Sequence, residues 1–179
     1  MAGRFGIIAG QSAAGPMPNV FYPNWDVVAA NTTIIDNQLP TNKVLRTAGS
    51  AYAGALDSTV ILEDFELEYI VQATGENYKQ FGMTTSNSNP TANADAEGWF
   101  IVSASDVRAR VGLSDVASLT ITAGDVLKIE RIAGVSRWYK NNVLIYRKIP
   151  VFTGLVYPYA APGDPNLYVQ GLKITAYPH

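Results

Sequence analysis

The sequence predicts an all-β protein, built as a sandwich of two antiparallel sheets. From residue 43 onward, short runs of alternating polar and apolar residues are separated by turn residues at intervals of about 8 to 12 residues, which is typical of sandwiches and barrels. No stretch combines a sustained helical period with helix caps. With 179 residues, the chain is long enough for one buried core and too short for two comfortable domains.

The clearest strand covers residues 64–71. Its apolar and acidic residues alternate strictly, with Phe65, Leu67, Tyr69 and Val71 on one face and Asp64, Glu66 and Glu68 on the other. Successive side chains of a strand point to opposite faces of the sheet. We therefore expect one face of this strand in the core and the other in water.

Two hairpins follow in the second half of the chain. Residues 126–132 alternate in the same way, and Ala133-Gly134 then makes a tight turn into a strand at 135–140. Asn141-Asn142 makes the next turn, into 143–146, because Asn tolerates a positive φ. Further strands are expected at 79–84, 98–103, 107–112, 118–122, 155–160 and 167–176. The apolar positions of the last one change parity across Gly171, which indicates a β-bulge.

Residues 1–42 have a different composition, rich in Gly, Ala, Pro and Asn. Prolines interrupt regular structure there, so we expect an extended arm with a short strand at 4–9, preceding a sandwich domain at 43–179. The arm carries too many apolar residues for a solvated tail, among them Phe5, Ile7, Phe21 and Trp25. We expect these four to pack on the sandwich or on a neighbouring subunit, where the arm would also cover an edge strand.

Composition excludes several classes of function. The formal net charge is −2, so no cationic field is expected that would collect nucleic acid or a membrane surface. The chain has no cysteine and one histidine, His179 at its end, which excludes disulfides, thiolate metal sites and histidine-based triads. The apolar runs are too short for a secretory signal or a membrane span, so we expect synthesis in a cytoplasm without classical export.

From about residue 43 onward, the order of segments resembles that of the concanavalin A-like lectin and glucanase jelly rolls. Three stretches carry the resemblance: residues 50–59 before the strand at 65, residues 81–83 with 99–102, and the series 124–131, 135–142, 145–146 and 155–160. It implies two antiparallel sheets stacked face to face, and modules of this kind recur in bacterial surface proteins and in phage tail fibres or virion decorations. The first 42 residues lie outside it.

Carbohydrate binding is the chemistry that the resemblance and the aromatic content favour. A pyranose presents C–H faces that stack on aromatic rings and hydroxyls that bridge to amides and carboxylates. One of the neighbours Trp138 and Tyr139 is expected to face outward, since adjacent residues alternate; for every ring the alternative is core packing. The candidate residues are Trp99, Trp138, Tyr139, Asn87, Asn89, Asp95 and Asp164.

Catalysis and metal binding are the alternatives. Asp64, Glu66 and Glu68 depart from the Glu-x-Asp-x-Glu pattern of the related glucanases, so we expect a solvated strand face, with hydrolysis by Glu66 and Glu68 as the alternative. The loop at 84–98 offers oxygen donors of the kind calcium prefers, at Asn87, Asn89, Asn93, Asp95 and Glu97. The calcium arrangement of legume lectins is not found there. We expect no catalytic residue, metal or cofactor, with calcium as the one alternative.

These observations predict a non-enzymatic structural or binding module. Only 16% of the residues are charged, below the roughly 25% of an average soluble domain, and such surfaces are typical of particle-assembled β proteins. We expect a phage virion component, a tail or head fibre or a capsid decoration, located in the virion. Its expected partners are other virion proteins, copies of itself and cell-surface glycan, with no nucleic acid and no membrane. The alternatives are a stand-alone lectin domain and a glycoside hydrolase.

Overall fold

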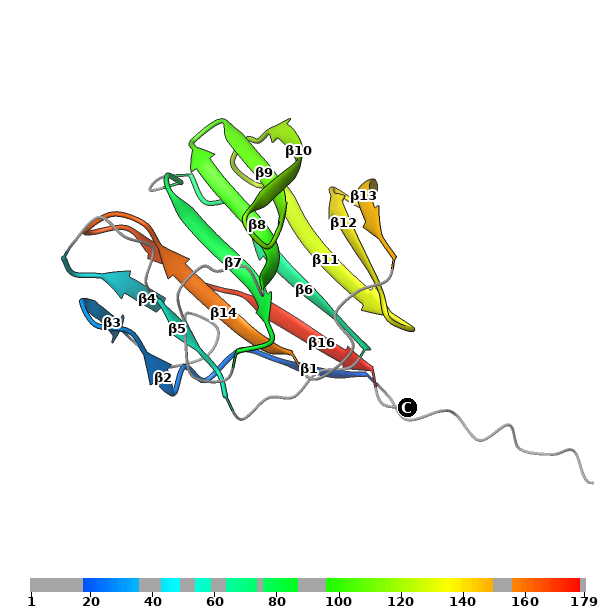
Figure 1. Cartoon of the computed structure of the whole chain (residues 1–179). Helices are drawn as coiled ribbons and strands as arrows, with labels where there is room; N and C mark the ends of the chain where they lie inside the picture. Colours follow the sequence, from blue (N-terminus) through cyan, green and yellow to red (C-terminus); the bar gives the residue numbers. More distant parts are fainter. Residues whose placement is uncertain are drawn as a thin grey trace, which may run out of the picture.

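The strands of the protein form two large stacked sheets and a small third one. The computed structural model describes residues 18–35, 43–48, 54–58, 64–73, 76–86, 96–149 and 156–177. Figure 1 shows the two larger sheets as separate layers, with β7, β8 and β14 in one and β6, β11 and β16 in the other. Within the described part of the chain there is no helix, and hence none that could cross a membrane.

The first layer has six strands. In spatial order they are β1 (Asn19–Phe21), β16 (Lys173–Tyr177), β6 (Asp64–Ile70), β11 (Val126–Ile132), β12 (Val135–Lys140) and β13 (Val143–Lys148). All of these pairings are antiparallel. The hairpin turn between β12 and β13 has positive φ at both Asn141 and Asn142, the backbone of the primed turns that match strand twist.

The second layer has seven strands, and a third sheet of three strands completes the described fold. The seven strands are β10 (Ser114–Thr120), β9 (Asp106–Val111), β8 (Ala96–Ser103), β7 (Lys79–Thr84), β14 (Tyr157–Pro162), β5 (Ala55–Leu56) and β2 (Val27–Val28). The three are β15 (Tyr168–Val169), β4 (Lys43–Arg46) and β3 (Thr32–Ile35). The predicted all-β jelly-roll sandwich is confirmed.

Alternation along the strands decides which residues form the core. On β6 the apolar set Phe65, Leu67 and Tyr69 is at most 1% exposed, whereas the acidic set on the opposite face is half-buried. The Tyr69 ring meets Phe81 of the other layer with ring centroids 4.4 Å apart. The core therefore lies between the two sheets, and the acidic face of β6 is turned away from it.

Two tryptophans tie the layers together. Trp99 of β8 donates its indole N–H to the carbonyl oxygen of Lys128 on β11, at 3.3 Å. Trp138 of β12 donates in the other direction, to the carbonyl oxygen of Gly98 on β8, at 3.0 Å. Both side chains are 0% exposed. Each large ring thus fills the core while its one polar group finds a partner on the opposite sheet.

Close backbone approach explains the glycine beside Trp99. A Cβ added to Gly98 would lie 2.4 Å from the carbonyl oxygen of Phe81 on the neighbouring strand. Gly98 faces Gly82 across the β7 and β8 pairing. The absence of side chains at both positions lets these two strands pair without a clash.

Residues 18–35 join the sandwich at three places. β1 pairs with β16, β2 with β5 and β3 with β4. The expected cover of a sheet edge is therefore confirmed at β16. Phe21 packs partly against the core, and Trp25 is buried in it at 4% exposure. Trp25 thus presents no surface to a neighbouring subunit, while Phe5, Ile7 and the strand expected at 4–9 lie outside the described residues. The division at residue 42 stays a prediction.

Most of the predicted strands are confirmed. Some strands begin or end at other residues than predicted, where the sequence did not show the position of a turn. The strands at 79–84, 126–132 and 135–140 have the predicted bounds. β10 begins at Ser114, earlier than expected, because only Gly112 and Leu113 separate it from β9. Gly171, with φ of 69°, does more than bulge the last predicted strand. It separates β15 from β16, which belong to different sheets.

Replacing Trp138 by alanine tests the tie between the sheets. We expect Trp138→Ala to lower the free energy of unfolding by about 3–5 kcal/mol, because the change opens a core cavity and removes the donor to the Gly98 carbonyl. Urea denaturation followed by circular dichroism measures it. Leu144→Ala on β13, where the side chain is 50% exposed, is the control, expected to change stability by about 0.5 kcal/mol or less. Equal effects of the two variants would contradict the assignment.

Candidate functional site

The outer face of the six-stranded sheet carries a row of five side chains that runs across the strands. Lys173 lies opposite Glu68, Glu68 opposite Lys128, and Lys128 opposite Tyr139. Tyr22 follows β1 directly, beside Lys173, because the preceding Phe21 pairs with Ile174. All five side chains are half-buried. The order Tyr-Lys-Glu-Lys-Tyr thus places an aromatic ring at each end of three charged groups.

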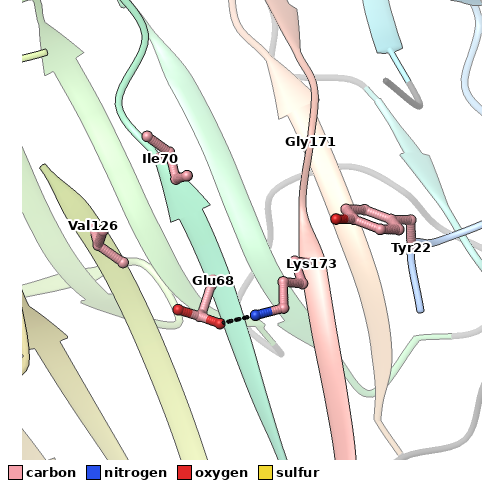
Figure 2. Close-up of a pocket in the computed structure, with 6 residues that line it drawn as sticks. All are labelled: Tyr22, Glu68, Ile70, Val126, Gly171 and Lys173. Carbon is pink, nitrogen blue, oxygen red and sulfur yellow. Dashed lines mark hydrogen bonds and ion pairs between the residues drawn. The ribbon is translucent and has the colours of Figure 1, made fainter. Parts of the chain in front are cut away.

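A pocket opens at the Tyr22 end of this row. Its lining residues are Tyr22, Glu68, Ile70, Val126, Gly171 and Lys173, around a volume of about 140 Å³. In Figure 2 the Tyr22 ring projects toward the chain around Gly171, and the Glu68 and Lys173 side chains point toward each other. Ile70 and Val126 are cross-strand partners and add an apolar side. The pocket therefore combines an aromatic ring, an apolar wall and an ion pair.

Gly171 shapes the pocket through its backbone. Its φ of 69° lies in the left-handed region, which glycine adopts at no steric cost. The chain can turn there from β15 toward β16, and Gly171 adds no side chain to the pocket wall that it forms. The pocket thus lies at the position where the parity of the strand pattern changes.

The ion pair of the pocket is short and partly exposed. Lys173 Nζ lies 2.8 Å from Glu68 Oε1, with the two side chains 41% and 28% exposed. The hydrogen bond to Glu68 raises the pKa of Lys173, against burial, which lowers it. Pairs this exposed contribute about 1 kcal/mol or less to stability. The ammonium and the carboxylate can therefore take part in binding as well as in folding.

A second row of charges runs beside the first. Glu66 lies opposite Glu130, and Glu130 opposite Arg137; Arg137 and Glu130 form an ion pair at 2.8 Å. Tyr177 of β16 reaches the same area. Burial, and then a hydrogen bond with Glu66, raise the pKa of Tyr177 to about 12. The Tyr177 phenol is protonated at neutral pH and donates to Glu66, and its raised pKa extends this state to more alkaline pH.

The arrangement places hydrogen-bond donors and acceptors beside aromatic side chains. Glu66 forms an ion pair with the Lys128 ammonium at 3.4 Å, and Glu68 forms one with the Lys173 ammonium at 2.8 Å. Carboxylates accept hydrogen bonds, ammonium groups donate them, and a phenol does both. A molecule rich in hydroxyl groups can use all three, and its apolar faces can rest on the rings.

Comparison with known proteins bears on the fold. No protein-family model and no curated protein matches the sequence. Solved structures do match. The chain resembles lectin-type jelly rolls. The carbohydrate recognition domain of Emp47p superposes with a TM-score of 0.52 at 9% identity, covering 95% of this chain and 100% of that one.

Two more solved domains match the fold of this chain. The exoplasmic/lumenal domain of VIP36, in its Ca²⁺/Man3GlcNAc-bound form, has a TM-score of 0.53 at 12% identity, with 89% of each chain covered. The PSpry domain of TRIM65 has a TM-score of 0.51 at 11% identity, covering 87% of this chain and 92% of that one. At these identities the similarity is one of fold. It agrees with the jelly roll expected from the order of the sequence segments.

The structure corrects two of the predicted carbohydrate-binding residues. Trp99 and Trp138 are both 0% exposed, so neither ring face can meet a sugar. Tyr139 faces outward at the end of the row described above. This confirms the expectation that one of the adjacent residues Trp138 and Tyr139 faces outward. Asp164 is half-buried, and its carbonyl oxygen accepts the Leu167 amide in the turn before β15. Three further candidates, Asn87, Asn89 and Asp95, lie outside the described residues.

The calcium alternative loses one of its donors. Glu97 points into the sandwich, where Ser136 Oγ donates to its Oε2 at 2.6 Å and Lys148 Nζ lies 3.3 Å from its Oε1. At 4% exposure, this carboxylate is engaged inside the protein. Over the ranges that the structure describes, no group of three or more His, Cys, Asp or Glu residues could hold a metal ion.

Sequence reasoning missed Tyr22, Lys128, Gly171 and Lys173 as members of the site. Both lysines occupy the outward positions of predicted strands, which is the signal that could have found them. Their neighbours depend on strand order, and β16, β6 and β11 come from distant parts of the chain. The pattern of one strand at a time does not contain that information.

The raised pKa of Tyr177 provides a test of the second row. We expect Glu66→Gln to lower this pKa from about 12, because the substitution removes a negative charge beside the phenol; burial should hold it above the ordinary value of 10.0. A pH titration followed by NMR on protein with ¹³C-labelled tyrosine measures it. Asp106→Asn on β9 of the other sheet is the control. An unchanged Tyr177 titration in Glu66→Gln would contradict the contact.

Proposed function

We propose that this chain is a non-enzymatic carbohydrate-binding module that takes a sugar ring in the pocket at Tyr22. The observation that carries the proposal is the pairing of a half-buried tyrosine ring with the Lys173 and Glu68 ion pair in one small hollow. Carbohydrate binding requires stacking surface and paired donors and acceptors in the same place. This pocket has both.

The size and lining of the pocket suit one ring. Its volume of about 140 Å³ is below the roughly 300–1,000 Å³ of pockets that hold drug-sized ligands. The C–H face of a pyranose would rest on Tyr22, with Ile70 and Val126 at its apolar side. Glu68 would accept and Lys173 would donate hydrogen bonds to neighbouring hydroxyls. Such contacts bind a sugar without cleaving it.

The pairing of the carboxylates favours binding over hydrolysis. A glycosidase needs one carboxylic acid to protonate the leaving oxygen and a second carboxylate as nucleophile or base. Here Glu66 and Glu68 each hold a lysine ammonium, so a substrate would have to displace two ion pairs. The glycoside hydrolase is therefore the second candidate function, supported by the presence of the two carboxylates on one strand face.

The fold neighbours are consistent with a carbohydrate ligand. One is a carbohydrate recognition domain, that of Emp47p, and another, VIP36, was solved with Man3GlcNAc. Both share the jelly roll and little sequence with this chain. Their ligands motivate the choice of sugars as the first compounds to test.

For the biological setting we propose a phage virion, as a tail or head fibre or a capsid decoration. The support is compositional: 16% charged residues and no cysteine, together with the resemblance to modules of virion proteins. In that setting the partners are other virion proteins or copies of this chain, and the sugar belongs to a host cell surface. A stand-alone lectin domain is the alternative setting for the same pocket.

Replacing Tyr22 by alanine tests the pocket. We expect Tyr22→Ala to weaken monosaccharide binding about tenfold, the equivalent of roughly 1.4 kcal/mol, through loss of the stacking surface. A glycan array identifies the sugar, and isothermal titration calorimetry measures the affinity. Tyr78→Ala is the matched control, since Tyr78 is 46% exposed and directly precedes β7 of the other sheet.

The same sugar separates binding from hydrolysis. Incubation of the protein with oligosaccharides should release no reducing ends. If sugar is released and Glu66→Gln or Glu68→Gln abolishes the release, the non-enzymatic proposal is wrong. If the protein binds no glycan on the array and calorimetry detects no sugar binding, the binding proposal is wrong as well.

Co-sedimentation tests the virion setting. After lysis of the producing cells, we expect the chain to sediment with phage particles in a density gradient, because a structural component stays bound to its assembly. Immunoblotting of the fractions measures this, and an abundant enzyme of the host cytoplasm is the control. Recovery of the chain only as free protein, with particles lacking it, would contradict the setting and leave the lectin alternative.

A further inference from the structure

We infer that the ligand is an extended, uncharged oligosaccharide that lies across the strands, from the pocket at Tyr22 to a second subsite at Tyr139. The inference rests on the proposed function and deepens it, because it names the class of sugar. It goes beyond a single ring in a pocket. Three features of the outer sheet face carry it: the geometry of the row, the weak contacts at its far end, and the balance of its charges.

The row gives the ligand a straight path. Lys173, Glu68, Lys128 and Tyr139 are direct cross-strand neighbours, so the row runs perpendicular to the strands. Neighbouring strands lie about 4.8 Å apart, and the four intervals from β1 to β12 therefore amount to about 19 Å. That length exceeds one pyranose ring several times over. A chain of sugars fits it, with an aromatic residue at each end.

Contacts at the far end of the row are loose. Lys128 Nζ lies 3.4 Å from Glu66 Oε1 and 4.8 Å from the centroid of the Tyr139 ring. The Tyr139 hydroxyl donates to Glu130 at 3.4 Å. Both hydrogen bonds are longer than the common ranges, which are about 2.7–3.2 Å for N–H···O and about 2.5–3.0 Å for O–H···O bonds. Sugar hydroxyls can replace these contacts at little cost, whereas the 2.8 Å pair at Glu68 is tighter.

The charges around the row cancel, which selects an uncharged ligand. Lys173 pairs with Glu68, Lys128 with Glu66, and Arg137 with Glu130. Arg147 of β13, opposite Arg137, and Asp64 of β6 add one charge of each sign to this face. A uronate, sulfate or sialate would gain little attraction from such a surface and would meet the carboxylates as like charges. Neutral hydroxyls bind to it without that penalty.

Chain length is the variable that tests the inference. Calorimetry is carried out on the full chain with neutral cello-, manno- and xylo-oligosaccharides, from the monosaccharide to the hexasaccharide. For the series that binds, we expect the affinity to rise about tenfold from the monosaccharide to the longest member, as a second aromatic contact would provide. Tyr139→Ala should remove this gain and leave monosaccharide affinity unchanged. Tyr78→Ala is the control, and circular dichroism verifies that every variant is folded.

Each outcome has one meaning. Monosaccharide and hexasaccharide binding with equal affinity, unchanged in Tyr139→Ala, would overturn the extended site and leave the pocket at Tyr22 standing. Tighter binding of oligogalacturonate or heparin fragments than of the neutral series would overturn the uncharged ligand. Binding of no sugar of any length would overturn the proposed function itself, and with it this inference.

Discussion

The reciprocal indole hydrogen bonds hold the two layers of this protein at a fixed separation and offset. Trp99 reaches from β8 to the backbone of β11, and Trp138 reaches back from β12 to the backbone of β8. A buried indole N–H without a partner is costly, so a sliding of one sheet over the other would break both bonds at once. The remaining core rings, such as Tyr69 and Phe81, pack within the frame that these two residues set.

The fixed inner face also determines the outer one. When Leu67, Ile129 and Trp138 face the core as cross-strand neighbours, the residues next to them on these strands must face outward. Three of those adjacent residues, Glu68, Lys128 and Tyr139, lie opposite one another. The register that buries the core therefore also aligns the row of polar and aromatic groups. A one-residue slip would exchange the two faces and bury the charges.

Paired charges give this face a different chemistry from that of a hydrolase built on the same kind of strand. Carboxylates at alternate positions supply the raw material for glycoside cleavage. The lysines on the two flanking strands, Lys128 and Lys173, neutralise them. What is left is a surface of donors, acceptors and rings, suited to hold a hydroxyl-rich molecule. In our proposal these flanking lysines favour sugar binding over hydrolysis on a strand pattern that permits both.

The sequence by itself determined the fold class, most strand positions and the two faces of β6, because these follow from local alternation of polarity and from turn residues. It also placed Tyr139 or Trp138 outward without deciding between them. Tertiary structure decided that Trp99 and Trp138 belong to the core, because the local sequence does not show whether an aromatic side chain in a strand is buried or exposed. It also brought Tyr22 beside Lys173 and Glu68. That meeting depends on which strands are neighbours, and strand order is set by packing of distant segments.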